Sequence, residues 1–294
     1  MTTLVQVLVS GVLVGGLYGI ISSGLSLSFG ISKIANFAHA DFVTIGMYSV
    51  VVLVGAFGSL GLLFLPLVVL AVGGLGVLMY LLLLRRSHVT AMNEDEAHLP
   101  QIVVTAGVGI FIQSLLLSLF SSNDRSISTI LDGSWNLAGV SVSKAQAVAF
   151  VVSLAAFAVI AIVVNRTEFG RALRSIVDDG EAAAAVGVNR AKMVAISIGI
   201  GIGLAGLAGG LLATYQTVNP TSGFNYLAMA FVVIILGGLG SIRGAFIAGI
   251  VVGVVQQATG TYVALDLQNV AIWVLFLVVL LVRPNGLFGK RVAL

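Results

Sequence analysis

The sequence predicts an all-α, polytopic integral membrane protein with about eight or nine transmembrane helices and one charge-rich helical segment outside the bilayer. Three observations predict this fold class. The 294 residues are 59% hydrophobic and have a mean hydropathy of +1.15, whereas soluble domains contain roughly 45–50% apolar residues. Only 9% of the residues are charged. The largest group of charges lies within residues 165–192, and very apolar runs flank that segment on both sides.

Nine apolar runs are long enough, or nearly long enough, to cross a bilayer, which takes about 20 residues. The seventh and eighth runs are short, and they are either true spans or half-helices that enter and leave from one side. The side of the membrane predicted for each end of the chain is the same for either choice. The expected spans are 4–29, 34–56, 61–84, 101–120, 144–164, 193–213, 226–240, 244–259 and 268–282.

The basic residues predict the orientation, because cytoplasmic loops carry an excess of Lys and Arg. Only Arg125 and Lys144 fall on the side opposite the charge-rich segment. That segment and the tail, residues 283–294, are therefore expected to be cytoplasmic, and the N-terminus external. The basic residues expected inside are Lys33, Arg85, Arg86, Arg166, Arg171, Arg174, Arg190, Lys192, Arg243, Arg283, Lys290 and Arg291.

The charge-rich segment has the pattern of two short helices. Asp178 and Glu181 have the spacing of a capping box, so a first helix is expected to end near residues 178–180 and a second to end at Gly187. The apolar residues of the first helix recur at helical spacing and form one stripe. These residues are Phe169, Ala172, Leu173, Ile176 and Val177.

A faint internal repeat relates the two halves of the chain. Residues 36–45 and 225–234 share a pattern of Asn, aromatic, Phe, Val and Ile, and five spans separate the two copies. The copies would therefore enter the membrane from opposite faces, as inverted-topology repeats do. We expect one transmembrane domain, 1–294, with a first repeat at about 1–164, the charge-rich segment at 165–192, a second repeat at about 193–282 and the tail at 283–294.

The first copy of this repeat contains an unusual stretch, residues 36–42, in which His39 and Asp41 lie at the head of a predicted span. Ionisable groups in a span are costly unless they face protein or water. Two interpretations stay open: with Lys33 they lie at the cytoplasmic interface and cap the second helix, or they form part of a pathway or its inner gate. The residues of the second hypothesis are Asn36, His39 and Asp41, with Asn225 and Tyr226 as counterparts in the second copy.

Several function classes are not supported by the residues. The glycine-rich run 236–240 follows no strand, and no Gly-x-x-x-x-Gly-Lys-[Ser/Thr] occurs, so the chain is not expected to hydrolyse ATP. The chain has no cysteine, and its histidines, His39, His88 and His98, lack metal-ligand spacing. No nucleophile–base pair suggests an enzyme, and a formal charge of +3 does not indicate nucleic-acid binding. No cofactor or metal is expected.

The charge-rich segment resembles the EAA loop of ABC importer permeases. Glu181, Ala182 and Ala183 are followed by Gly187, and the preceding residues 169–174, FGRALR, resemble the branched-chain amino acid (high-affinity leucine/isoleucine/valine) permease family. The resemblance covers nearly the whole chain. It includes NFAHADF at 36–42, where Ala40 replaces the usual glycine, then 219–223, 236–241 and 283–289.

The resemblance implies a permease subunit of an ABC importer in a prokaryotic inner membrane. Its implied partners are ATP-binding cassette subunits, a second related permease or a second copy of this chain, and an extracytoplasmic substrate-binding protein. The implied cargo is branched-chain amino acids or similar small solutes. The residues implied to couple the chain to the ATPase are Phe169, Gly170, Arg171, Leu173, Arg174, Glu181, Ala182, Ala183 and Gly187.

A second class of function stays open on the residues alone. Inverted repeats suit an ATP-independent secondary transporter or channel equally well, and Asp41 with His39 would then be a candidate proton site. The spans otherwise contain almost no ionisable residue, which leaves few groups to couple an ion gradient. Which solute is carried is not decided by the sequence.

Overall fold

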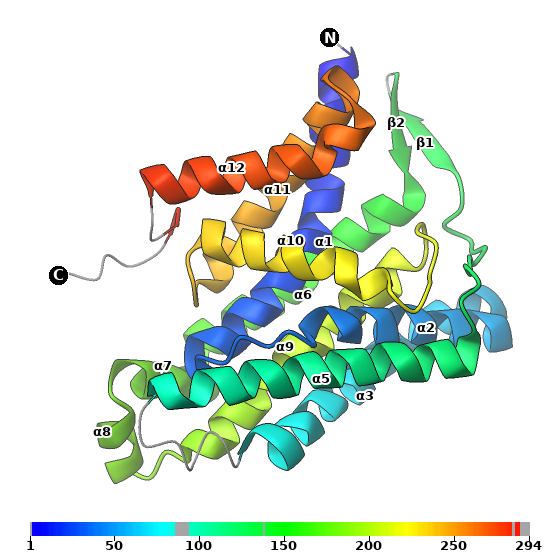
Figure 1. Ribbon diagram of the computed structural model, residues 1–294. Coiled ribbons are helices and arrows are strands. Elements are labelled where there is room, and N and C mark those ends of the chain that lie inside the picture. Colours follow the sequence, from blue (N-terminus) through cyan, green and yellow to red (C-terminus); the bar gives the residue numbers. More distant parts are fainter. Residues whose placement is uncertain (1, 86–93, 138, 284–285, 289–294) are drawn as a thin grey trace.

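The computed structural model describes residues 2–85, 94–137, 139–283 and 286–288, and these form a helical bundle with one small β-hairpin (Figure 1). The helices are α1 (Thr2–Ser32), α2 (His39–Phe57), η1 (Gly58–Phe64), α3 (Leu65–Met79), η2 (Tyr80–Leu84), α5 (Glu94–Phe120), α6 (Lys144–Arg166), α7 (Glu168–Asp178), α8 (Gly180–Ala185), α9 (Arg190–Leu212), α10 (Ser222–Gly237), α11 (Ile242–Tyr262), η3 (Leu265–Leu267) and α12 (Gln268–Val282). The hairpin pairs β1 (Ser134–Leu137) with β2 (Val140–Ser143).

Among the described residues, seven helical stretches are long and apolar enough to cross a membrane. One of them, His39–Leu84, consists of α2 and α3, which pack against each other after the turn at η1. The shorter helix α10 is also apolar, and its 16 residues would extend about 24 Å. The predicted class, an all-α polytopic membrane protein, is confirmed, and the predicted eight or nine spans compare with these seven stretches and α10.

The hairpin between α5 and α6 was not expected from the sequence. The side chain of Gln6 on α1 binds the backbone of Ser141 in β2. Its Oε1 accepts from the Ser141 N–H at 2.8 Å, and its Nε2 donates to the Ser141 carbonyl at 2.7 Å. The contact joins the first turns of α1 to this loop.

The charge predictions for Arg86, Lys290 and Arg291 and the loop at 86–93 lie outside the described residues.

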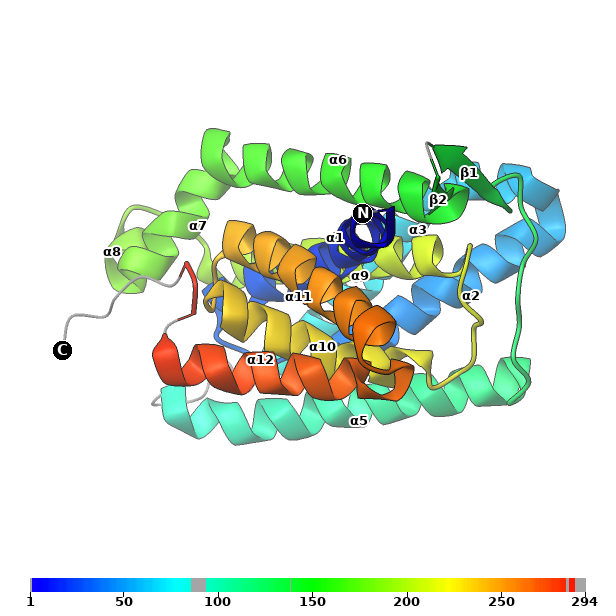
Figure 2. The same ribbon diagram turned by 90° about the horizontal axis from the view of Figure 1, so that it is seen from above.

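Two tilted helices, α1 and α9, form the centre of the bundle, and α5, α6 and α12 lie around them (Figure 2). Glycines allow the backbones of α1 and α9 to touch: a Cβ built on Gly24 would lie 2.5 Å from the carbonyl oxygen of Gly201. Small residues at such crossings are how membrane helices approach closely. The most extensive helix pairings are α1 with α11 and α9 with α3.

The two ends of the bundle carry different elements. The helices α7 and α8 lie at one end, on the left in both figures, and the C-terminal end of α12 points the same way. The turn at η1 and the loop after α5 lie at the opposite end. This loop is tied to the α9–α10 connection, because Arg125 and Val218 exchange backbone hydrogen bonds of 2.9 and 2.8 Å.

The helices α2 and α10 begin after matching turns. Asn36 Oδ1 accepts from the Ala38 N–H, and Asn219 Oδ1 accepts from the Thr221 N–H, both at 3.1 Å. In each turn the residue that opens the helix donates its N–H to the Asn carbonyl. The local counterpart of Asn36 is therefore Asn219, six residues before Asn225. The predicted repeat instead pairs Asn36 with Asn225, because it follows residue identity within α10 and not the turn before it.

Candidate coupling segment and membrane-embedded polar site

The charge-rich segment folds as two helices, α7 and α8, as the pattern predicted. The cap between them is Asp179, whose Oδ1 accepts from the N–H groups of Glu181 and Ala182 at 3.0 and 2.9 Å. The predicted cap, Asp178, instead ends α7. Asp179 has extended backbone dihedrals, which an N-cap requires, whereas Asp178 is helical.

The helix α8 ends in a Schellman motif. The N–H of Gly187 donates to the Ala184 carbonyl and that of Val188 to the Ala183 carbonyl, both at 3.0 Å. Gly187 has a φ of +90°, a conformation that residues with a side chain rarely adopt. The glycine at this position is explained by the turn itself.

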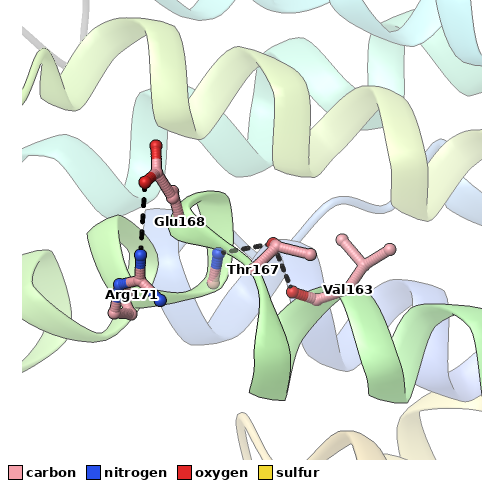
Figure 3. Close-up of polar contacts among 5 residues, drawn as sticks. Val163, Thr167, Glu168 and Arg171 are labelled. Carbon is pink, nitrogen blue, oxygen red and sulfur yellow. Dashed lines mark hydrogen bonds and ion pairs between the residues drawn. The ribbon is translucent and has the colours of Figure 1, made fainter.

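The last turn of α6 anchors α7. Thr167 connects the two helices: its hydroxyl donates to the Val163 carbonyl at 2.6 Å and accepts from the Gly170 N–H at 3.3 Å (Figure 3). Gly170 packs so closely that an added Cβ would overlap the carbonyl oxygen of Val164. Arg174 donates from Nη1 to that same carbonyl. A cation at carbonyls left free by a helix end is favourable.

Arg171 lies on the exposed side of α7. It pairs with Glu168 at 3.3 Å (Figure 3), but the side chains are 63% and 95% exposed, and such surface pairs contribute at most about 1 kcal/mol. The ion pair therefore does not hold the segment in place, and both groups are free to meet a partner.

The implied coupling residues divide into buried and exposed groups. Leu173 is buried and Phe169 is half-buried against the core, so both fix the segment to the spans. Ala183 is only 3% exposed; it anchors α8 and is not available for contact with another protein. The exposed residues of α8 and its end are Glu181, Ala182, Ala184, Ala185, Val186 and Gly187, with Val186 80% exposed.

The second candidate site surrounds the start of α2. His39 Nε2 lies 3.0 Å from the carbonyl oxygen of Ile21 on α1, so Nε2 carries the proton, because a carbonyl only accepts. Asp41 Oδ1 accepts from Gln113 Nε2 on α5 at 2.8 Å. A Cβ added to Gly109 of α5 would overlap Asp41 Oδ2. Two helices thus pack around the first turn of α2.

These contacts place both ionisable side chains deep in the bundle. Gly109 is the middle of the span Leu99–Phe120, about 15 Å from either end. Ile21 is 11 residues before the end of α1, again about 16 Å. The interpretation that His39 and Asp41 cap α2 at the interface is wrong: α2 follows Ala38 with no side-chain cap. Lys33, by contrast, is exposed just after α1.

The chain reaches this depth without helical structure. Residues 33–38 connect α1 to α2, so the helix begins at His39, five residues after the start of the predicted span 34–56. The Thr105 hydroxyl of α5 satisfies part of this backbone: it accepts from the Phe37 N–H at 3.3 Å and lies 3.4 Å from the Ala35 carbonyl. Irregular backbone at membrane depth is tolerated only where protein or a cavity supplies such partners.

A hollow of about 310 Å³ opens beside this site, between α5 and the turn that starts α10. Gln113 lines it and also bonds Asp41. Gln113 and Thr105 were not expected to belong to a site, although both are polar residues within the predicted span 101–120. The residues that line the hollow are Ile110, Gln113, Ser114, Leu117, Ser122, Asn219, Pro220 and Thr221.

The remaining predicted pathway residues do not gather in one place. Asn36 is buried and shapes the turn before α2. Asn225 is exposed on α10. Tyr226 is half-buried, and its ring centroid lies 6.5 Å from that of Tyr18 on α1. No hydrogen bond or ring contact among the described residues joins Asn225 or Tyr226 to the site around Asp41.

Comparison with known proteins connects these features to one family. Residues 7–282 match the family described as the permease component of the branched-chain amino acid transport system. The chain is 29% identical to the high-affinity branched-chain amino acid transport system permease protein LivH of Salmonella typhimurium, and also 29% identical to BraD of Pseudomonas aeruginosa. Each alignment covers 97% of this chain and 95% of the relative.

A more distant relative has another cargo in its name. Over 100 residues, 31% of this chain and 28% of the relative, the chain is 40% identical to the fructose import permease protein FrcC of Rhizobium meliloti. No solved structure matches the chain. The family match covers nearly all of the described bundle, including both candidate sites. The chain therefore belongs to the branched-chain amino acid transport system permease component family.

Proposed function

We propose that this chain is a membrane-spanning permease subunit of an ABC importer for branched-chain amino acids or similar small solutes. An external binding protein would deliver the solute, and separate ATPase subunits would drive transport through residues 165–192. A second permease chain, related or identical, would complete the pathway. The segment 165–192 and the tail would be cytoplasmic, the N-terminus external, and the membrane a prokaryotic inner membrane. ATP hydrolysis would reside on the partner chain.

The observation that supports this function best is the construction of α7 and α8. Two short helices project at one end of the bundle: α7 packs on α6 through the Gly170–Val164 contact, and α8 packs on α7. Glu181 on α8 and Val186 just after it are both exposed. A rigid attachment with an exposed apolar tip suits a segment that transmits movement from a partner.

The helix pairing supports an inverted repeat as the moving framework. The repeat would match α1, α2 and α3 with α9, α10 and α11, in that order. It would then map the pairing of α1 with α11 onto the pairing of α9 with α3. These two pairings are the most extensive in the bundle, and the starts of α2 and α10 have the same turn. Such repeats alternate access by rocking about their interface. The ATPase states must differ in their free energy of contact with α8 for ATP to drive this change.

Val186→Asp is expected to reduce the ATPase that co-purifies with the chain at least tenfold. An unpaired carboxylate buried in an apolar contact costs more than 1.4 kcal/mol, which is tenfold in affinity. The chain would be co-expressed with the ATPase and permease genes beside it and purified through a tag on this chain. Val263→Asp is the matched control, since Val263 is 68% exposed after α11. Equal ATPase recovery from both variants would exclude α8 as the contact.

A further inference from the structure

Polar side chains on one side of α2 form a row that starts at Asp41, in the first turn of α2 and beside the middle of the α5 span. Asp41, Thr44 and Tyr48 recur at i, i+3 and i+7, which places them on one side of the helix. All three are at most 5% exposed. The hydroxyls of Thr44 and Tyr48 have no hydrogen-bond partner among the described residues. Buried polar atoms are nearly always paired, so these two hydroxyls leave unused hydrogen-bonding capacity along the row.

The row leads away from Asp41 along α5 and the start of α10. Thr44 Oγ1 lies 2.6 Å from the Cβ position of Gly223, in the first turn of α10. The ring of Tyr48 stacks on Phe120, at the end of α5, with centroids 4.4 Å apart. The three groups therefore follow the border of α2 with α5 and α10, from mid-span to the end opposite α7 and α8.

Gln113 is the only side chain that the contacts of the described residues place between Asp41 and the hollow. Its Nε2 donates to Asp41 Oδ1, and the same side chain lines the hollow. No hydrogen bond among the described residues reaches Asp41 Oδ2. A carboxylate offers about four acceptor sites, so most of its capacity is unused. Rotation of Gln113 would expose the carboxylate to whatever occupies the hollow.

We propose that Asp41 binds the ammonium group of the amino acid as the substrate crosses the bilayer, with Gln113 as the partner it exchanges for that group. An ammonium group carries three N–H donors and a positive charge. The contacts of the described residues give the buried carboxylate of Asp41 no such positive partner. The non-helical residues 33–38 deliver α2 to mid-span, and interrupted helices are where transporters bind their substrates. Ile110 and Leu117 give the hollow an apolar side for an aliphatic side chain.

This inference rests on the proposed function and is tested with the complete importer in proteoliposomes. Asp41→Asn keeps the shape and the contact with Gln113 but removes the charge. Losing a charge-assisted hydrogen bond is expected to lower leucine uptake roughly tenfold to a hundredfold. Asp266→Asn, on an exposed aspartate in η3, is the matched control and should transport as the unsubstituted chain does.

Two analogues identify the group that Asp41 recognises. 3-Methylbutylamine is leucine without its carboxylate, and 4-methylpentanoate is leucine without its amino group. The amine should inhibit uptake by the unsubstituted importer but not the residual uptake by Asp41→Asn, whereas the acid should affect both alike. Effects of either analogue on the binding protein are common to both importers and cancel in the comparison. Unchanged uptake by Asp41→Asn, or equal inhibition of both by the amine, would overturn the proposal.

A second variant decides the question if Asp41→Asn fails to assemble. Gln113→Met removes the competing amide from a half-buried position and leaves the carboxylate in place. The amine should then inhibit at several-fold lower concentration, a gain that misfolding does not produce. Inhibition at an unchanged or higher concentration would refute the ammonium site. Loss of ATPase co-purification from the unsubstituted chain would instead refute the proposed function, since that readout does not depend on Asp41.

Discussion

Gly209→Val is expected to prevent the chain from folding into a stable bundle. An added Cβ at Gly209 of α9 would overlap the carbonyl oxygen of Val43 on α2, and Gly46 of α2 meets the Gly206 carbonyl in the same way. Overpacking usually costs roughly 1–3 kcal/mol, and here backbone meets backbone, so no side chain can rotate away. The measurement is the amount of monodisperse protein recovered after detergent extraction, with a loss of at least tenfold expected.

Gly74→Ala is the control for this prediction. Gly74 lies in the apolar helix α3, and a Cβ built there meets nothing within 4 Å. Replacing glycine by alanine in an open helical position stabilises a helix by about 0.5–1 kcal/mol, so recovery should be unchanged or improved. If Gly209→Val were recovered as well as Gly74→Ala, the described contact of α2 with α9 would be incorrect.

Gly170→Ala is expected to leave the spans folded but to disconnect α7 from α6. The added methyl group would overlap the Val164 carbonyl, and moving α7 away would also break the bond from Arg174 to that oxygen. Coupled leucine uptake should fall at least tenfold, because α8 would no longer follow the spans. Uptake per ATP hydrolysed, measured in proteoliposomes, is the readout.

The matched control lies in the same segment. Gly180 opens α8, and a Cβ there meets nothing within 4 Å. Gly180→Ala should therefore transport normally and purify like the unsubstituted chain. A Gly170→Ala importer with full coupling would show that the junction of α6 and α7 does not transmit force.

The fold class and the two short helices α7 and α8 were predictable because each depends on local pattern. Apolar runs of membrane length specify spans, and the stripe containing Leu173 and Ile176 specifies which side of α7 is buried. The cap was misplaced by one residue because Asp178 and Asp179 are both good N-cap residues. The choice between them depends on the backbone, where Asp179 is extended.

The depth of Asp41 could not be predicted, because it depends on contacts between spans distant in sequence. Residues 33–38 are irregular, and the Thr105 hydroxyl on another span satisfies part of their backbone. Hydropathy alone does not distinguish such a segment from a helix. Gly109 and Gln113 become neighbours of Asp41 only once α2 packs on α5. The likeness of the turns at Asn36 and Asn219 could not be predicted for a related reason: the two turns share hydrogen bonds but differ in sequence.

The most direct test of the account is a cross-link from α8 to the ATPase. The chain contains no cysteine, so Val186→Cys introduces a single thiol that a benzophenone maleimide can label. Illumination of the assembled importer should attach the ATPase to Val186→Cys, with more adduct in one nucleotide state than in another, and should give none from Val263→Cys. Adducts from neither position, or equally from both, would contradict a permease driven through α7 and α8.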